Sequence, residues 1–239
     1  MPPPDFLVIA GLAALLGGIV QGSVGLGVGL VATPVVTMLF PSLMPGAVLV
    51  AAFVLPLATL AQEVRYADLR GLGWAFGGRF AGTPVGVLVV AVVPARGLGI
   101  VVGGMVLAAL GATAWSGRVP RNRATLVTAG LAAGAVGTAS AIGGPPLALL
   151  YQRESGPRVR ATLAVFSTVG ALLSLLTLTA AGQLPMRQVT AGLALTPFVL
   201  AGFAIAGPVR RYLDEGRTRA ALLVVVGTAS AALIVRSLA

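Results

Sequence analysis

Arg79 is the residue of this sequence best suited to bind a charged partner. It stands alone in the otherwise uncharged stretch from Gly71 to Ala95, about 12 Å along a helix from the start of that stretch. Its planar guanidinium donates hydrogen bonds in a fork that matches a sulfonate or a carboxylate. An arginine within an apolar helix predicts a functional site. The alternative is that its long side chain reaches back to the interface at the helix end, helped by Gly77 and Gly78.

Two glycine-rich stretches are the second candidate feature. Residues 21–29 read Gln-Gly-Ser-Val-Gly-Leu-Gly-Val-Gly, and residues 142–146 read Ile-Gly-Gly-Pro-Pro. Glycine costs about 1 kcal/mol in a helix interior, and proline does not continue a helix. Each stretch therefore predicts a non-helical tip between two half-length helices. The alternative is that these glycines only allow helices to pack closely.

The second helix of each pair is expected to begin at the tip, near Gly29 and near Pro145. Free N–H groups at a helix N-terminus, together with the helix dipole, suit an anion. Pro145 and Pro146 lack N–H groups, so the second tip offers fewer donors than the first.

Neutral side chains near the two tips complete the predicted site. Serine and threonine in membrane helices more often bond to the preceding turn of their own helix, which is the alternative for each of them. The predicted substrate-binding residues are Gln21, Gly22, Ser23, Gly25, Gly27, Gly29, Arg79, Thr138, Ser140, Gly143 and Gly144.

Composition excludes most catalytic and metal chemistry. The chain has no His and no Cys, which removes imidazole bases, thiolate nucleophiles and the usual zinc ligands. None of the six acids stands in the middle of an apolar run; they are Asp5, Glu63, Asp68, Glu154, Asp214 and Glu215. We expect no enzyme, no metal site and no cofactor. Glu63 is expected to form a salt bridge at an interface, close to Arg65.

The hydropathy indicates a membrane protein. Hydrophobic residues make up 57% of the 239 residues, and charged residues only 9%, against about 25% in soluble domains. Long uncharged stretches alternate with short arginine clusters, as loop arginine does in membrane proteins. The net charge of +10 therefore does not indicate nucleic-acid binding, since no aromatic-rich basic segment accompanies it.

The order of the segments predicts one domain, residues 1–239, made of two repeats at about 6–117 and 124–237. Each repeat consists of a glycine-broken hairpin followed by three transmembrane helices, and a basic joint at 118–123 separates them. A shift of 116 residues aligns Gly18 with Gly134 and Gly27 with Gly143. The expected fold is an all-α polytopic membrane protein.

The distribution of arginine between the loops favours inverted repeats. If each broken segment enters and returns to the same side, twelve arginines share one side and only Arg96, Arg187 and Arg236 oppose them. If both broken segments cross fully, the split is eight to seven. The positive-inside rule then predicts a cytoplasmic 118–123 joint and both termini outside. Two complete short crossings per broken segment give the same orientation.

These motifs resemble the TauE/SafE sulfite exporter family of membrane transporters. The resemblance rests on Gly22-x-x-Gly25-x-Gly27-x-Gly29 with Pro34, and on residues 142–146 followed by Pro-Arg-Val-Arg-Ala-Thr at 157–162. It extends over essentially the whole chain. Val28 and Leu30 interrupt the denser glycine run usual in the family. The resemblance implies transport of sulfite, organosulfonates or other small organic anions across a bacterial inner membrane.

The sequence therefore predicts a transporter that moves small sulfonate-type anions by alternating access. Its expected partners are a small anionic substrate and the lipid bilayer, with no nucleic acid; a homo-oligomer is compatible with the pattern. A passive anion channel and a non-transporting assembly or scaffold protein are the alternatives.

Overall fold

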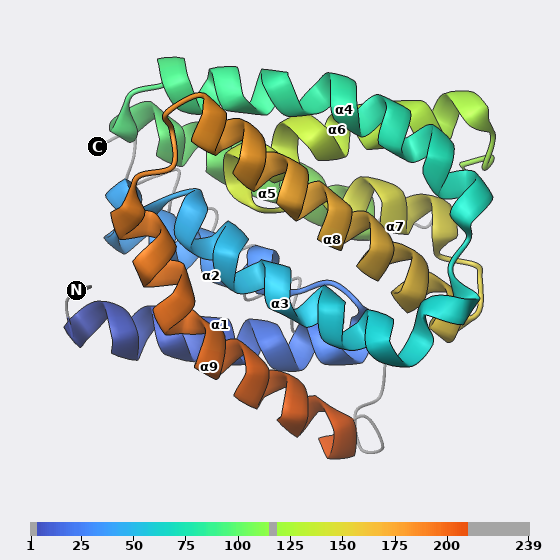
Figure 1. Cartoon of the computed structure of the whole chain (residues 1–239), viewed down its shortest axis with the longest axis horizontal. Helices are drawn as coiled ribbons and strands as arrows, with labels where there is room; N and C mark the ends of the chain where they lie inside the picture. Colours follow the sequence, from blue (N-terminus) through green and yellow to red (C-terminus); the bar gives the residue numbers. More distant parts are fainter. Residues whose placement is uncertain (1–3, 115–118, 210–239) are drawn as a thin grey trace.

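The computed structural model describes residues 4–114 and 119–209, and every regular element within these ranges is helical (Figure 1). The α-helices are α1 Pro4–Val24, α2 Val28–Leu39, α3 Gly46–Glu63, α4 Leu69–Val92, α5 Ala95–Ala114, α6 Arg123–Ser140, α7 Pro145–Tyr151, α8 Gly156–Ala180 and α9 Met186–Val209. Two short 3₁₀ turns, η1 Pro41–Leu43 and η2 Val64–Tyr66, flank α3. The last part of the second repeat, from residue 210 onward, lies outside the described residues, as do Arg118 of the basic joint and residues 1–3.

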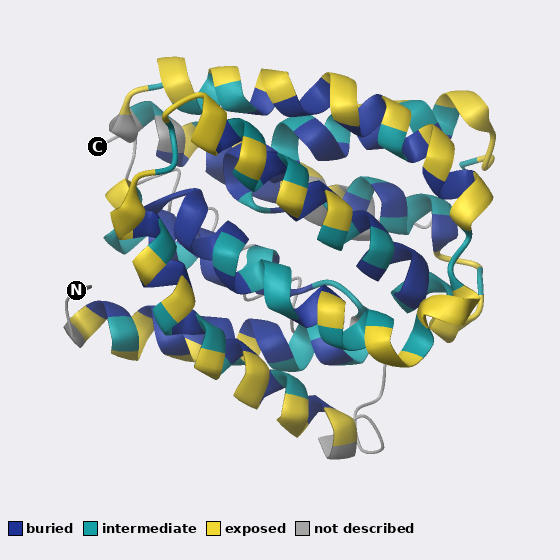
Figure 2. Cartoon of the chain, in the orientation of Figure 1, coloured by how far each residue is buried: buried dark blue, intermediate teal, exposed yellow. Residues whose placement is uncertain are grey.

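Helices α1, α3, α4, α8 and α9 are each long and apolar enough to cross a membrane. Large apolar side chains on their outward faces are exposed, among them Leu12, Leu88, Leu176 and Leu193. Buried positions face the interior of the bundle and exposed positions face outward (Figure 2). This pattern suits a hydrocarbon solvent. The predicted all-α polytopic membrane protein is confirmed at this level.

Helices are interrupted in both glycine-rich stretches, as the sequence predicts. The first break is at residues 25–27, where Gly25 has a φ of 95°, and the second is at residues 141–144, where Ala141 has a φ of 60°. These positive φ values end a right-handed helix. Helices α2 and α7 then begin at Val28 and Pro145, close to the predicted starts.

The two arms of each broken segment differ in length, so the prediction of half-length helices is wrong for α1 and α6. The first arms have 21 and 18 residues, and the second arms have 12 and 7. Helix α1 continues through Gly18 and Gly22 because α9 packs directly on these glycines. A β-carbon at Gly18 would lie 2.5 Å from the Val199 carbonyl oxygen. Glycine is thus compatible with a helix where a neighbouring helix covers it.

Close backbone contacts join segments that are far apart in the sequence. Helix α1 packs on α9, and α4 packs on α6. In the second pair, Gly82 and Gly86 of α4 lie against backbone carbonyl oxygens of α6. Helices α3 and α8 pack on each other at the centre, and α3 also contacts α9 as α8 contacts α4. The bundle therefore surrounds the two helix breaks with long helices.

Two corners at opposite ends of the bundle hold the helices together by different chemistry (Figure 1). At the start of α3, the Gln188 amide accepts from the N–H of Gly46 at 3.0 Å and donates to the carbonyl oxygens of Ser42 and Met44 at 3.2 and 2.7 Å. This first corner is neutral, and Gln188 is only 5% exposed. At the start of α4, the second corner contains carboxylates and arginines.

Candidate functional site

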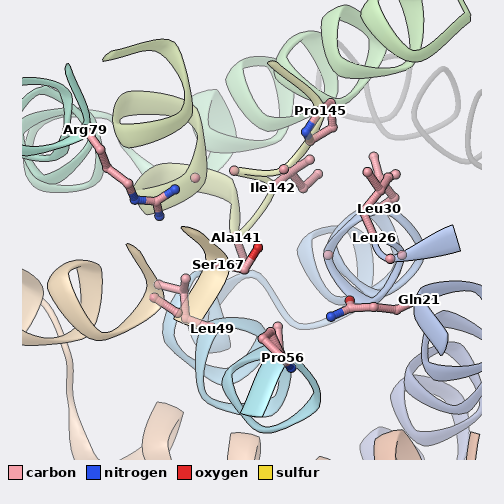
Figure 3. A pocket seen from close by; sticks show the side chains of 18 residues that line it. Gln21, Leu26, Leu30, Leu49, Pro56, Arg79, Ala141, Ile142, Pro145 and Ser167 are labelled. Carbon is pink, nitrogen blue, oxygen red and sulfur yellow. The ribbon is translucent and has the colours of Figure 1, made fainter. Parts of the chain in front are cut away.

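A cavity of about 60 Å³ lies between the two helix breaks (Figure 3). A water molecule needs roughly 10–15 Å³ on the same measure, so the cavity holds several waters or a small anion. Helices α3 and α8 supply its other walls. The residues around it are Gln21, Gly25, Leu26, Gly27, Gly29, Leu30, Leu49, Ala52, Pro56, Arg79, Gly137, Ala141, Ile142, Gly143, Gly144, Pro145, Ser167 and Ala171.

The two breaks contact each other beside this cavity. The backbone of Gly29 lies against the carbonyl oxygen of Ala141, and a β-carbon at Gly144 would lie 3.5 Å from that of Leu26. The hydroxyl of Thr33 donates to the carbonyl oxygen of Ser140 at 2.7 Å. Residues more than 100 positions apart in the sequence therefore form one continuous wall.

The N-terminus of α2 points donors toward this wall. The side-chain oxygen of Gln21 accepts from the N–H of Val28 at 3.0 Å. The next two N–H groups of α2, those of Gly29 and Leu30, have no acceptor in the described part of the chain. In Figure 3 the amide nitrogen of Gln21 points into the cavity from the side opposite Arg79. The first break thus offers neutral donors, as expected for its glycines.

Arg79 reaches the cavity from the middle of α4. Its side chain is only 3% exposed, so it does not extend to the helix end. The guanidinium forms no hydrogen bond and no ion pair with any described residue, and its Nε is buried without an acceptor. Its Cζ lies 4.8 Å from the centre of the Phe166 ring. An arginine without a hydrogen-bond acceptor has its donors available for a ligand.

Four predicted site residues lie outside the cavity, and each contacts a neighbouring helix or its own. Gly22 packs against Phe203 and Ala206 of α9. The hydroxyls of Ser23 and Ser140 donate to carbonyl oxygens four residues earlier in their own helices. The hydroxyl of Thr138 shares a 2.8 Å hydrogen bond with that of Ser174. Ser23 and Ser140 therefore follow the alternative that such hydroxyls bond to the preceding turn of their own helix, whereas Thr138 bonds to a neighbouring helix. Gln21, Gly25, Gly27, Gly29, Arg79, Gly143 and Gly144 all line the cavity.

Helices α3 and α8 also line the cavity, which the sequence did not predict. Leu49, Ala52 and Pro56 line the cavity from α3, and Ser167 and Ala171 line it from α8. Four of these five residues are apolar and carry no chemical signal. The hydroxyl of Ser167 is the one polar side chain among these five residues, and Pro56 is the one that can alter its helix.

The charged corner adjoins the cavity at Gly25. Arg160 donates to both carboxylate oxygens of Glu63, with its Nε 3.0 Å from Oε2. A β-carbon at Gly25 would lie 3.2 Å from Cγ of Arg160. The salt bridge predicted for Glu63 is therefore present, but its partner is Arg160. Arg65 instead lies over the ring of Tyr66.

Asp68 is the centre of the same corner. Its carboxylate accepts from the N–H of Gly71 at 3.1 Å and from the hydroxyl of Tyr151 at 2.8 Å. Arg158 lies 3.9 Å from it. Burial raises the pKa of the Asp68 carboxyl, but these hydrogen bonds and the charges of Arg121 and Arg158 outweigh burial and hold this pKa below its usual range.

No curated protein and no solved structure matches the chain significantly. The family model described as "Sulfite exporter TauE/SafE" matches residues 10–233. This match includes both helix breaks, Arg79, the whole of α3, α4, α8 and α9, and α1 from residue 10 onward. The chain therefore belongs to the TauE/SafE sulfite exporter family.

Proposed function

We propose that this membrane protein transports small anions of the sulfite or organosulfonate type by alternating access. The anion binds in the cavity between the two helix breaks. The proposed anion site consists of the cavity-lining residues with available donors and their glycine neighbours: Gln21, Gly25, Gly27, Gly29, Arg79, Gly143 and Gly144.

The observation that carries this proposal is the buried, unpaired guanidinium of Arg79. An arginine at the centre of a membrane helix costs about 2.5 to 3.5 kcal/mol or more. A buried donor without an acceptor adds a further desolvation penalty. An anion in the cavity supplies both the missing acceptor and the missing negative charge. Sulfite and sulfonates carry several oxygens, which suits a fork of parallel N–H donors.

Neutral donors opposite Arg79 support the same class of ligand. Gln21, Gly29 and Leu30 line the cavity and provide neutral donors: the side-chain amide of Gln21 and the N–H groups of Gly29 and Leu30. Helix α2 has 12 residues, and the positive end of its dipole lies at these N–H groups, which favours an anion. Helix α7 has only 7 residues and begins with two prolines, so it adds little to anion binding.

The proposed mechanism of alternating access is supported by a pairing of helices between the two halves of the chain. The contact of α1 with α9 corresponds to that of α6 with α4, and the contact of α3 with α9 corresponds to that of α8 with α4. This exchange is expected for two repeats related by a two-fold axis, and we propose that these are the inverted repeats at about 6–117 and 124–237. We further propose that the 118–123 joint is cytoplasmic and both termini are outside, in a bacterial inner membrane.

Flux of sulfite into liposomes that contain the purified protein tests this function. We expect saturable uptake and counterflow. Arg79→Ala should weaken anion affinity by about 1.5 to 3 kcal/mol, the contribution of a charged hydrogen bond, and Arg79→Lys should restore only part of it. The control is Arg123→Ala, because Arg123 lies over the exposed Trp74 ring away from the cavity.

Three outcomes contradict the proposal. Unchanged sulfite binding in a folded Arg79→Ala variant removes Arg79 from the site. Flux that does not saturate and shows no counterflow indicates a passive channel. Absence of flux for sulfite, sulfonates and carboxylates in every gradient indicates a protein that assembles partners rather than a transporter.

A further inference from the structure

Arg79 is held in a slot that two residues of α8 form. One face of its guanidinium lies on the ring of Phe166, which is fully buried. The same ring also stacks on Phe76, with 5.5 Å between ring centres and 23° between the planes. Phe76 and Arg79 are three residues apart on α4, so two side chains of α4 contact the Phe166 ring. These contacts restrict the ring and, through it, the position of the guanidinium.

Gly170 lies one helical turn after Phe166 on α8, and the guanidinium occupies the space that its missing side chain leaves. A β-carbon at this position would overlap Cζ, Nε and one terminal nitrogen of Arg79. Two further glycines border the same group. A β-carbon at Gly143 would lie 2.7 Å from one terminal nitrogen, and one at Gly137 would lie 3.3 Å from the other.

No hydrogen bond orients this guanidinium, because no described residue accepts from it. Its direction is set by the shape of the slot and by attraction to the Phe166 ring. Such cation–π contacts are stronger when the two groups are desolvated. The cavity side of the slot is open at Gly143 and Gly137, both of which line the cavity.

We infer that Phe166 and Gly170 are positioning residues for anion recognition: they hold the Arg79 fork with its terminal nitrogens directed into the cavity. They touch Arg79 and act on the anion through it. This inference rests on the proposed function. It also predicts that the site discriminates by geometry, since a fixed planar fork favours oxyanions with two accessible oxygens over a spherical halide.

Sulfite binding to the purified full-length protein in detergent, measured by calorimetric titration, tests the inference. We expect Gly170→Ala to weaken binding on the order of tenfold or more, because it displaces the guanidinium. Phe166→Leu should weaken binding roughly fivefold or more, because the aromatic face is lost. In an Arg79→Ala background neither change should have any further effect. The matched control is Gly77→Ala on α4, where a β-carbon meets open space.

The double variants separate a positioning role from a structural one. An equal loss of affinity with and without Arg79 overturns the inference, because the two residues would then act on the fold. Unchanged binding in folded Gly170→Ala or Phe166→Leu overturns it as well, while a loss in Arg79→Ala alone still supports the proposed function. Unchanged binding in Arg79→Ala removes both proposals. If Gly170→Ala does not fold, the Phe166→Leu pair of measurements decides.

A halide competition gives a second readout. Chloride should displace sulfite poorly from the wild-type protein. In Phe166→Leu, the ratio of chloride affinity to sulfite affinity should be higher than in the wild type. An unchanged ratio of chloride to sulfite affinity in Phe166→Leu contradicts the geometric discrimination.

Discussion

The backbone of Gly29, in the first turn of α2, lies directly against the carbonyl oxygen of Ala141, which ends α6. A β-carbon at position 29 would overlap this oxygen, and neither backbone yields easily. We expect Gly29→Ala to lower the free energy of unfolding by about 1 to 3 kcal/mol, as overpacking does. Thermal unfolding in detergent measures this change.

The control is Gly77→Ala, where the added β-carbon meets open space. It should be neutral or stabilise the fold by up to about 1 kcal/mol. A Gly29→Ala variant as stable as wild type would show that the two breaks are not tightly packed.

The ion pair of Glu63 with Arg160 should couple more strongly than a typical exposed pair. Its side chains are 19% and 20% exposed and share several short contacts, whereas Arg121 and Glu154 are 32% and 26% exposed and share one. We expect a coupling of about 1 to 2 kcal/mol for the first pair and under about 1 kcal/mol for the second. Double-mutant cycles with Glu→Gln and Arg→Gln changes measure both. Equal coupling energies would show that the greater burial of the Glu63–Arg160 pair does not strengthen it.

Asp68 should make stability depend on pH in the acidic range. Its pKa in the folded protein is lower than in the unfolded chain, so the unfolded state takes up a proton first as pH falls. The stabilisation is fully present above the ordinary carboxyl pKa of about 3.9 and is lost as pH falls through the lowered value. Melting temperatures between pH 6 and pH 3 should decline more steeply for wild type than for Asp68→Asn. Parallel declines would contradict this prediction.

The proposed orientation can be tested with single cysteines, since the chain has none of its own. Pro120 is exposed in the joint before α6, and Met186, at the start of α9, is 72% exposed. The neighbouring Asn122 is a less suitable position for a cysteine than Pro120, because its side chain caps α6. We expect a membrane-impermeant thiol reagent to label Met186→Cys in intact cells and Pro120→Cys only after the cytoplasmic side is opened. Labelling of Pro120→Cys from outside reverses the orientation.

Composition and hydropathy were sufficient to predict the helical membrane class. The glycine and proline motifs predicted both helix breaks, and the resemblance of these motifs to a known family predicted the family. Breaks at residues 25–27 and 141–144 follow from glycine and proline chemistry, which acts locally. The lengths of the arms do not follow from it. Gly18 and Gly22 continue α1 because α9 covers them, and that contact joins residues about 180 positions apart. Local propensity contains no information about such a partner.

The candidate site was predictable where its residues have unusual chemistry. Arg79 and the glycines of both breaks line the cavity. Thr138 and Ser140 do not, since their hydroxyls are used by Ser174 and by a carbonyl oxygen. Phe166 and Gly170 were not predictable as neighbours of Arg79, because phenylalanine and glycine in an apolar helix most often only pack against other helices.

The two ends of the bundle differ in chemistry, since the Gln188 corner is neutral and the Asp68 corner is charged. Dissolved salt screens charges over about 8 Å at physiological ionic strength, which weakens the contacts of Asp68 with Arg158. It leaves the neutral amide bonds of Gln188 to the backbone unaffected. A rise in salt concentration is therefore expected to weaken the contacts at one end of the helix bundle and to leave those at the other end unchanged.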